Sequence, residues 1–269
     1  MKLQLKRLIS QIIFFFTANL GALGIKTGFC YPFFYCNACP AADAGCPIRA
    51  IEIGVFRGNI AWKLILYPLL ILGFVGTISG RAVCGWACPI GFLQRATSPI
   101  PRKLKKFSLI QKLGNHKIEP YLRYIKYAGL LGLVILIPIL IGFMFTDICP
   151  IGFLTGTIPI MILNPGKYIP SSYFYLAFVS FIFFIALIFT VERGWCRYFC
   201  PVGAILAPFN KISKIHVSVD LNKCVHCNTC SQACPMGIDV PNMNRSPECI
   251  LCGKCIKACP KLAISYKGR

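Results

Sequence analysis

Cysteine is the residue type in this chain whose number and spacing suggest chemistry. Seventeen of the 269 residues are cysteines, and most stand in Cys-x2-Cys or Cys-x3-Cys groups, several of them followed by proline. Disulfide scaffolds are short and rich in loops, whereas cysteines grouped at fixed spacings are typical of metal sites. We therefore interpret these thiols first as metal ligands. The three histidines do not cluster and acidic residues are few, so we expect no catalytic residues.

Two groups near the C-terminus carry the most specific spacing. Residues 223–235 and 248–260 each contain C-x2-C-x2-C-x3-C-P. In bacterial ferredoxins with this spacing, three cysteines of a group bind one [4Fe–4S] cluster and the fourth binds the neighbouring cluster. A zinc site needs one set of four ligands and no such crossing. We predict one cluster on Cys224, Cys227, Cys230 and Cys259, and a second on Cys249, Cys252, Cys255 and Cys234.

The residues around these groups complete a small α+β domain. Residues 214–219 and 263–266 are short apolar segments that we expect to pair as strands. The segment 214–269 therefore resembles a bacterial two-cluster ferredoxin domain. His226 lies between two predicted ligands, where we expect it to tune the cluster through hydrogen bonding and not to bind iron.

Composition indicates that the rest of the chain, residues 1–213, is an α-helical membrane domain. Hydrophobic residues make up 56% of the chain and the mean hydropathy is +0.66, yet the net charge is +21. Basic residues that flank apolar spans are typical of membrane proteins. Nucleic-acid binding is the other interpretation of a basic chain, but no groove-reading motif is present, so we expect no nucleic-acid partner.

Four segments are apolar over a length that crosses a hydrocarbon core of roughly 30 Å. They lie near Leu8–Ile25, Ile60–Ile78, Ala128–Phe145 and Tyr173–Val191. Lysine and arginine gather before the first span and between the second and third, so both termini and the ferredoxin domain are predicted to be cytoplasmic. The chain is then a multi-pass protein of the cell membrane. The basic run 101–106 is expected to contact anionic lipid, or secondarily a soluble acidic electron carrier.

Cys-Pro turns repeat along the membrane domain. The sequence Cys-Pro-Ile-Gly-Phe-Leu begins at Cys88 and at Cys149, a variant begins at Cys200, and Cys46-Pro-Ile is a shorter echo. Each half of the domain then has a span, an outer turn, a second span and an inner Cys-x3-Cys-Pro turn. Such halves are parallel repeats, related by an axis along the membrane normal, and this axis would bring equivalent turns together.

The two inner turns supply four thiols for one site. Gly91 and Gly203 allow the backbones to approach closely there. Buried free thiols and a tetrahedral zinc site remain alternatives. We predict a third iron–sulfur cluster at the inner face, with the ligands Cys84, Cys88, Cys196 and Cys200.

The outer turns offer five cysteines. Our preferred set for an outer cluster is Cys36, Cys39, Cys46 and Cys149, which leaves Cys30 without a partner. A disulfide is the alternative, because an outward location permits one.

The combination of four spans, two C-x3-C-P turns (84–89 and 196–201) and a two-cluster ferredoxin resembles the NapH-type membrane quinol dehydrogenase subunits, and also the membrane core of the NosR regulators. The resemblance implies electron transfer between a quinol pool, or a cytoplasmic donor, and the other subunits of a membrane redox complex. It also implies a quinone as a further cofactor, and no substrate chemistry in this chain. The cysteine-rich loop 30–46 departs from the NapH pattern and favours a relay that reaches the outer face.

Two other functions remain open at this point. The chain could be an accessory electron donor for the maturation or regulation of a metalloenzyme, as the NosR resemblance suggests. It could also be a membrane-tethered ferredoxin whose outer cysteines are structural or form disulfides.

Overall fold

The computed structural model describes residues 2–18, 46–56, 60–104, 119–163, 172–243 and 245–268. Of the predicted cluster ligands, Cys36 and Cys39 lie outside these residues, as do Cys30 and the end of the first predicted span.

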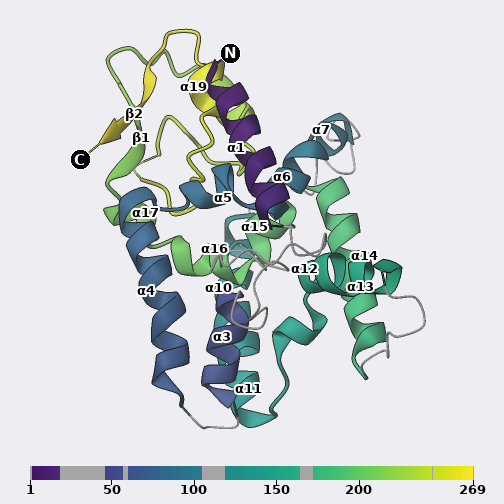
Figure 1. The fold of residues 1–269 in the computed structure, drawn as a ribbon. Coiled ribbons are helices and arrows are strands. Elements are labelled where there is room, and N and C mark those ends of the chain that lie inside the picture. The colour runs from purple at the N-terminus through teal and green to yellow at the C-terminus, as the bar shows by residue number, and fades with distance from the viewer. Residues whose placement is uncertain are drawn as a thin grey trace.

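The described residues before position 214 form helices joined by turns (Figure 1). The first half contains α1 (Lys2–Ala18), α3 (Pro47–Gly54), α4 (Trp62–Ser79), α5 (Ala82–Trp86), α6 (Pro89–Ala96) and α7 (Pro99–Leu104). The second half contains α9 (Glu119–Leu122), α10 (Ile125–Gly129), η3 (Leu130–Leu136), α11 (Ile137–Leu140), η4 (Phe145–Ile148), α12 (Pro150–Gly152), η5 (Phe153–Thr157), α13 (Ile158–Leu163), α14 (Phe174–Thr190), α15 (Gly194–Tyr198), α16 (Pro201–Leu206) and α17 (Phe209–Ile212).

Two helices among the described residues are long and apolar enough to cross a membrane. They are α4, of 18 residues, and the continuous helix Glu119–Leu140, of 22 residues, which runs from α9 to α11. Only 17% of each apolar window is buried within the protein, whereas the core helix of a soluble protein would be mostly buried. The helix α14 is also apolar but has 17 residues. These three helices overlap the second, third and fourth predicted spans. The helix α1 contains the described part of the first predicted span.

The third predicted span, Ala128–Phe145, is wrong at its C-terminal end. The helix begins at Glu119 and ends at Leu140, nine and five residues before the predicted limits. Gly142 has a φ of +72°, a left-handed conformation that a regular helix cannot include, and the chain continues into the short 3-10 helix η4. The apolar residues 141–145 extended the predicted span beyond the helix.

The Cys-Pro turns at Cys46, Cys88, Cys149 and Cys200 begin short helices, namely α3, α6, α12 and α16. In each, the cysteine has extended backbone angles and the proline occupies the first helical position. Cys88 and Cys149 have almost the same geometry, with a φ of −64° and a ψ of 120° and 121°. The residue before proline avoids the helical region, and proline itself fits the first turn, so the repeated sequence makes a repeated helix start.

The C-terminal segment contains two paired strands, as the sequence predicts. The strands β1 (Ile215–Val219) and β2 (Ile264–Gly268) are antiparallel, from the pair Ile215–Gly268 to the pair Val219–Ile264. Two short helices, α18 (Thr229–Gln232) and α19 (Lys254–Ala258), lie between the strands in sequence and pack against each other. This is a small α+β unit, at the top of Figure 1.

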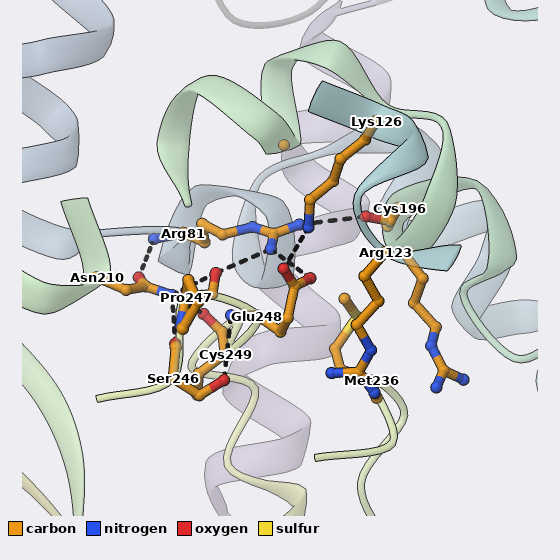
Figure 2. Close-up of polar contacts among 12 residues, drawn as sticks. Arg81, Arg123, Lys126, Cys196, Asn210, Met236, Ser246, Pro247, Glu248 and Cys249 are labelled. Atoms are coloured by element: carbon orange, nitrogen blue, oxygen red, sulfur yellow. Dashed lines mark hydrogen bonds and ion pairs between the residues drawn. The ribbon is translucent and has the colours of Figure 1, made fainter. Parts of the chain in front are cut away.

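The ferredoxin segment packs directly on the inner turns. Asn210 donates hydrogen bonds to the carbonyls of Ser246, Pro247 and Cys249, and its own side-chain oxygen accepts from the amide of Arg81 (Figure 2). The helix α1 begins beside α19 and ends near α6 (Figure 1), with the Gln4 amide donating to the Cys252 carbonyl. The two parts therefore share one interface around the inner turns. The division at residue 213 stays a prediction.

Candidate iron–sulfur sites

One cavity in the ferredoxin segment is lined by the first predicted set of thiols. This first cavity has a volume of about 350 Å³, its open side included, and apolar neighbours such as Val219 and Ile264. The amide of Ala263 donates to the sulfur of Cys259 at 3.4 Å. The cysteines that line it are Cys224, Cys227, Cys230 and Cys259.

A second cavity, also of about 350 Å³, is lined by the other set. Its remaining lining is apolar and includes Met236, Ile238 and Ile250. The four cysteines are Cys234, Cys249, Cys252 and Cys255. The structure thus brings together the same crossed sets that the spacing predicts, and the binding of iron by them stays a prediction.

Left-handed residues between the cysteines curl each loop around its cavity. His226 and Asn228 have φ angles of +50° and +56°, and Leu251 and Gly253 have +46° and +66° at the matching positions. Such angles turn the chain sharply, so consecutive thiols face one centre. The sequence interpretation of His226 emphasised its side chain, but the side chain is exposed and its backbone is what shapes the loop.

The chemistry of these cavities fits a multi-atom cluster. Among the residues that the structure describes, no three Cys, His, Asp or Glu side chains converge to hold a single metal ion. Four thiols instead surround an apolar space, as cluster ligands do. Burial raises the pKa of the Cys249 thiol to about 12, so a thiolate there needs a positive partner, which iron would supply.

The helices before position 214 bring the cysteines of the two inner turns together as well. We call Cys84, Cys88, Cys196 and Cys200 the inner quartet. Cys84 lies on α5 and Cys196 on α15, while Cys88 and Cys200 precede α6 and α16. The four thiols are close enough for a charge on one to act on the others. Three of them are less than 8% exposed.

Hydrogen bonds reach the sulfurs of the inner quartet from both repeats. The amides of Gly91 and Gly203 donate to Cys88 and Cys200, both at 3.4 Å. The side chain of Gln94 donates to Cys196 at 3.2 Å. Because donors to sulfur stabilise a negatively charged cluster, this arrangement suits iron–sulfur binding.

Two arginines cross between the repeats, and the sequence interpretation missed them. Arg81 donates to the carbonyl of Cys196 at 3.2 Å, and Arg193 donates to the carbonyl of Cys84 at 2.9 Å. Each arginine stands three residues before the first cysteine of its own turn. This shared spacing was the signal in the sequence from which a common role of the two arginines could have been predicted.

The outer turns contribute two described cysteines, Cys46 and Cys149. These thiols, the outer pair, are close enough for their charges to interact. They start α3 and α12, two helices from different repeats. The other members of the predicted outer set, Cys36 and Cys39, lie outside the described residues, so that set stays a prediction.

Comparisons with known proteins agree with this arrangement. A family model described as a 4Fe-4S binding domain matches residues 60–108 and 173–219, which contain the two inner turns. A 4Fe-4S dicluster domain matches residues 216–260. No solved structure matches the chain.

Relatives span archaea and bacteria. The uncharacterized protein MJ0750 of Methanocaldococcus jannaschii is 31% identical over 245 residues, which are 89% of this chain and 85% of that protein. The methylamine utilization ferredoxin-type protein MauN of Methylorubrum extorquens is 25% identical over 72% of this chain and 60% of its own length. The ferredoxin-type protein NapH of Escherichia coli is 26% identical over 70% of this chain and 59% of its own length. The resemblance seen in the sequence is confirmed: this chain belongs to the NapH-type family of 4Fe-4S ferredoxin-type electron-transfer proteins.

Proposed function

We propose that this protein is an integral-membrane electron conduit with more clusters than its ferredoxin segment holds. The first and second cavities hold one [4Fe–4S] cluster each, the inner quartet holds a third, and Cys36, Cys39, Cys46 and Cys149 hold a fourth. Bound clusters supply one-electron carriers, and the residues of the chain hold them and set the distances between them. The chain crosses the membrane four times, with both termini and the ferredoxin segment in the cytoplasm.

The observation that carries this proposal is the contact between the inner quartet and the second cavity. Cys84 and Cys252 belong to one packed cluster of side chains, with Leu206 and Ile250. Trp86, two residues after Cys84, donates its indole N–H to the Leu251 carbonyl at 2.9 Å. The two sites are therefore separated by packed protein without a solvent gap, as a relay requires.

The path continues from the inner quartet toward the outer pair. Ile151 and Phe145 pack in the same cluster of side chains as Cys88. Phe145 also packs in the cluster that contains Cys46. The short helix α3 packs against η3 and α16, so the outer turn reaches back into the protein. This supports a relay shorter than the roughly 30 Å of a hydrocarbon core.

The donor in this proposal is a soluble cytoplasmic carrier or the quinol pool, and the acceptor belongs to another subunit of a membrane redox complex. A quinone would exchange electrons with the inner or outer cluster. The basic residues at 102–106 would hold the cytoplasmic face against anionic lipid.

Freeze-quench EPR on anaerobically purified protein tests the conduit. A water-soluble reduced viologen is mixed with the oxidised protein in less than stoichiometric amount. We expect the ferredoxin signals first and a third iron–sulfur signal later, as electrons reach the inner quartet. A Cys84→Ser, Cys196→Ser double variant should lose the third signal and keep the ferredoxin pair. The control Cys30→Ser removes the cysteine that our assignment leaves out and should behave as wild type.

A different result of the same experiment would contradict the conduit. If electrons stay in two clusters in the wild type, and the double variant gives the same spectra, the protein is a membrane-tethered ferredoxin.

A further inference from the structure

The two arginines of the inner turns are related by the same internal symmetry as the cysteines. Arg81 reaches the repeat that contains Cys196, and Arg193 reaches the repeat that contains Cys84. A Cβ on Gly91 would lie 2.9 Å from the Arg193 guanidinium, and one on Gly203 would lie 3.0 Å from that of Arg81. The glycines therefore make room for the arginine of the opposite repeat.

Arg193 carries a buried charge without a matching carboxylate. Arg193 is 2% exposed, and its guanidinium donates to the carbonyls of Cys84 and Gly91. Within the described part of the chain, no acidic side chain forms an ion pair with it. A buried unpaired cation is costly, so an anion beside it is needed to stabilise the folded protein.

The surroundings of the inner quartet carry an excess of positive charge. Arg81 pairs with Glu248 at 2.9 Å, and the same carboxylate also pairs with Lys126 (Figure 2). Arg7 is 1% exposed and donates to the carbonyl of Gly85 at 2.7 Å, next to Cys84. These contacts therefore include one buried carboxylate, Glu248, and four buried cations, which are Arg7, Arg81, Lys126 and Arg193. Cys84 lies within the fields of Arg81 and Arg193, and Cys196 lies within that of Arg81.

The ferredoxin cavities differ from the inner quartet in one of these cations. No charged residue lines the second cavity, but Arg7 and Arg81 act on its thiols Cys252 and Cys249, so both sites share these two cations. The lysines that line the first cavity, Lys223 and Lys261, are exposed to water. Arg193 instead acts on Cys84 of the inner quartet and donates to its carbonyl. Water screens exposed charges, whereas a buried cation acts at full strength on a nearby cluster.

We infer that Arg193 is the built-in counter-charge of a cluster on the inner quartet, and that it raises the reduction potential of this cluster above those of the ferredoxin clusters. A reduced cluster carries one more negative charge than an oxidised one, so fixed cations stabilise the reduced form. One electron then passes from a reduced ferredoxin cluster to the oxidised inner cluster, and no proton is required. Electrons flow from the cytoplasm into the membrane domain. This inference rests on the proposed function, because it needs a third cluster.

Potentiometric EPR titration of the full-length protein tests the inference. Arg193 is the better target, since Arg81 also holds Pro247 and Glu248 of the ferredoxin segment. Arg193→Gln should lower the midpoint potential of the third cluster and leave both ferredoxin clusters unchanged. Arg193→Lys keeps the charge and should restore most of the potential. The control Lys63→Gln removes an exposed cation of α4 and should shift no cluster.

Each outcome of the titration supports or overturns either the inference or the proposed function. An unchanged third potential in Arg193→Gln overturns the inference, as does an equal shift in Arg193→Lys. If Arg193→Gln loses the third cluster by iron content, retention of it in Arg193→Lys supports a role for the charge. Loss in both variants shows that the shape of the guanidinium matters and overturns the role of its charge. A wild type without a third cluster refutes the proposed function instead, before any variant is compared.

Discussion

At the residue scale, the two halves of the inner quartet are alike in their backbone and different in one side chain. Both Cys88 and Cys200 accept a hydrogen bond from a glycine amide three residues later. Cys196 accepts another from Gln94, which lies ten residues after Cys84. The residue ten after Cys196 is Leu206, which is apolar. The internal symmetry is therefore broken at this side chain.

Replacing Gln94 tests its role in the inner cluster. Gln94→Leu removes a donor to the Cys196 sulfur, and donors to sulfur raise the potential of a cluster. We expect a lower midpoint potential for the third cluster in an EPR titration, with iron content unchanged. The ferredoxin clusters of the same sample serve as the internal control. An unchanged third potential would show that Gln94 only fills space.

The sequence predicted the cysteines of the sites and not the charges around them. Cysteine spacing determines which thiols share a loop, so the crossed ferredoxin sets follow from the chain itself. From the sequence, Gly91 was expected only to let the two backbones approach each other closely. That its space is taken by Arg193 depends on how the two repeats dock, and the shared spacing of the two arginines does not show which atoms they reach.

At the scale of elements, a charged junction ties three helices together. Glu192, which follows α14, accepts from Arg102 of α7 at 2.8 Å and from Lys254 of α19 at 2.9 Å. Burial alone would raise the pKa of Glu192, but hydrogen bonds and charge from these two partners lower it below its usual value. The carboxylate is therefore charged at neutral pH and links α19 of the ferredoxin segment to α7.

Glu192→Gln should weaken that link by about 1–3 kcal/mol, less than for a fully buried pair because Arg102 is 42% exposed. A lowered pKa means that the stabilisation is complete above the ordinary glutamate value, about 4.3, and is lost only as the pH falls below it. The deficit should therefore be equal at pH 6 and pH 8, measured by urea unfolding of the detergent-solubilised protein. A deficit that shrinks at pH 6 would contradict the lowered pKa.

The elements themselves were predicted unevenly. The strands and the apolar helices near 60–78 and 173–191 follow from local composition, which needs no knowledge of the fold. The span at 128–145 was misplaced because hydropathy averages over Gly142, where the chain turns. The inward packing of α3 was not predicted at all, since an apolar helix of eight residues gives no hydropathy signal that distinguishes it from a loop.

At the scale of the whole molecule, the order of sites follows from one interface. The first and second cavities share a core that includes Leu251 and Val240. The second cavity and the inner quartet share another, through Ile250. The shared cores therefore run from the first cavity through the second cavity to the inner quartet.

Gly85→Ala tests whether that interface carries electrons. A Cβ on Gly85 would collide with the carbonyl oxygen of Ile250, and such overpacking costs about 1–3 kcal/mol and separates the surfaces. We expect slower reduction of the third cluster in freeze-quench EPR, with all clusters present. The control Gly132→Ala adds a methyl group with nothing within 4 Å and should leave the rate unchanged. Equal rates in both variants would mean that electrons take another path.

The most direct test of the conduit is the content of iron and acid-labile sulfide per chain in anaerobically purified protein. One [4Fe–4S] cluster in each ferredoxin cavity would account for about 8 iron atoms. Our account predicts about 16, or about 12 if the outer pair loses its cluster during purification, with the same amount of sulfide. It also predicts that Cys84→Ser with Cys196→Ser removes about 4 of each. A wild-type content of about 8 that the double variant does not change would contradict the account.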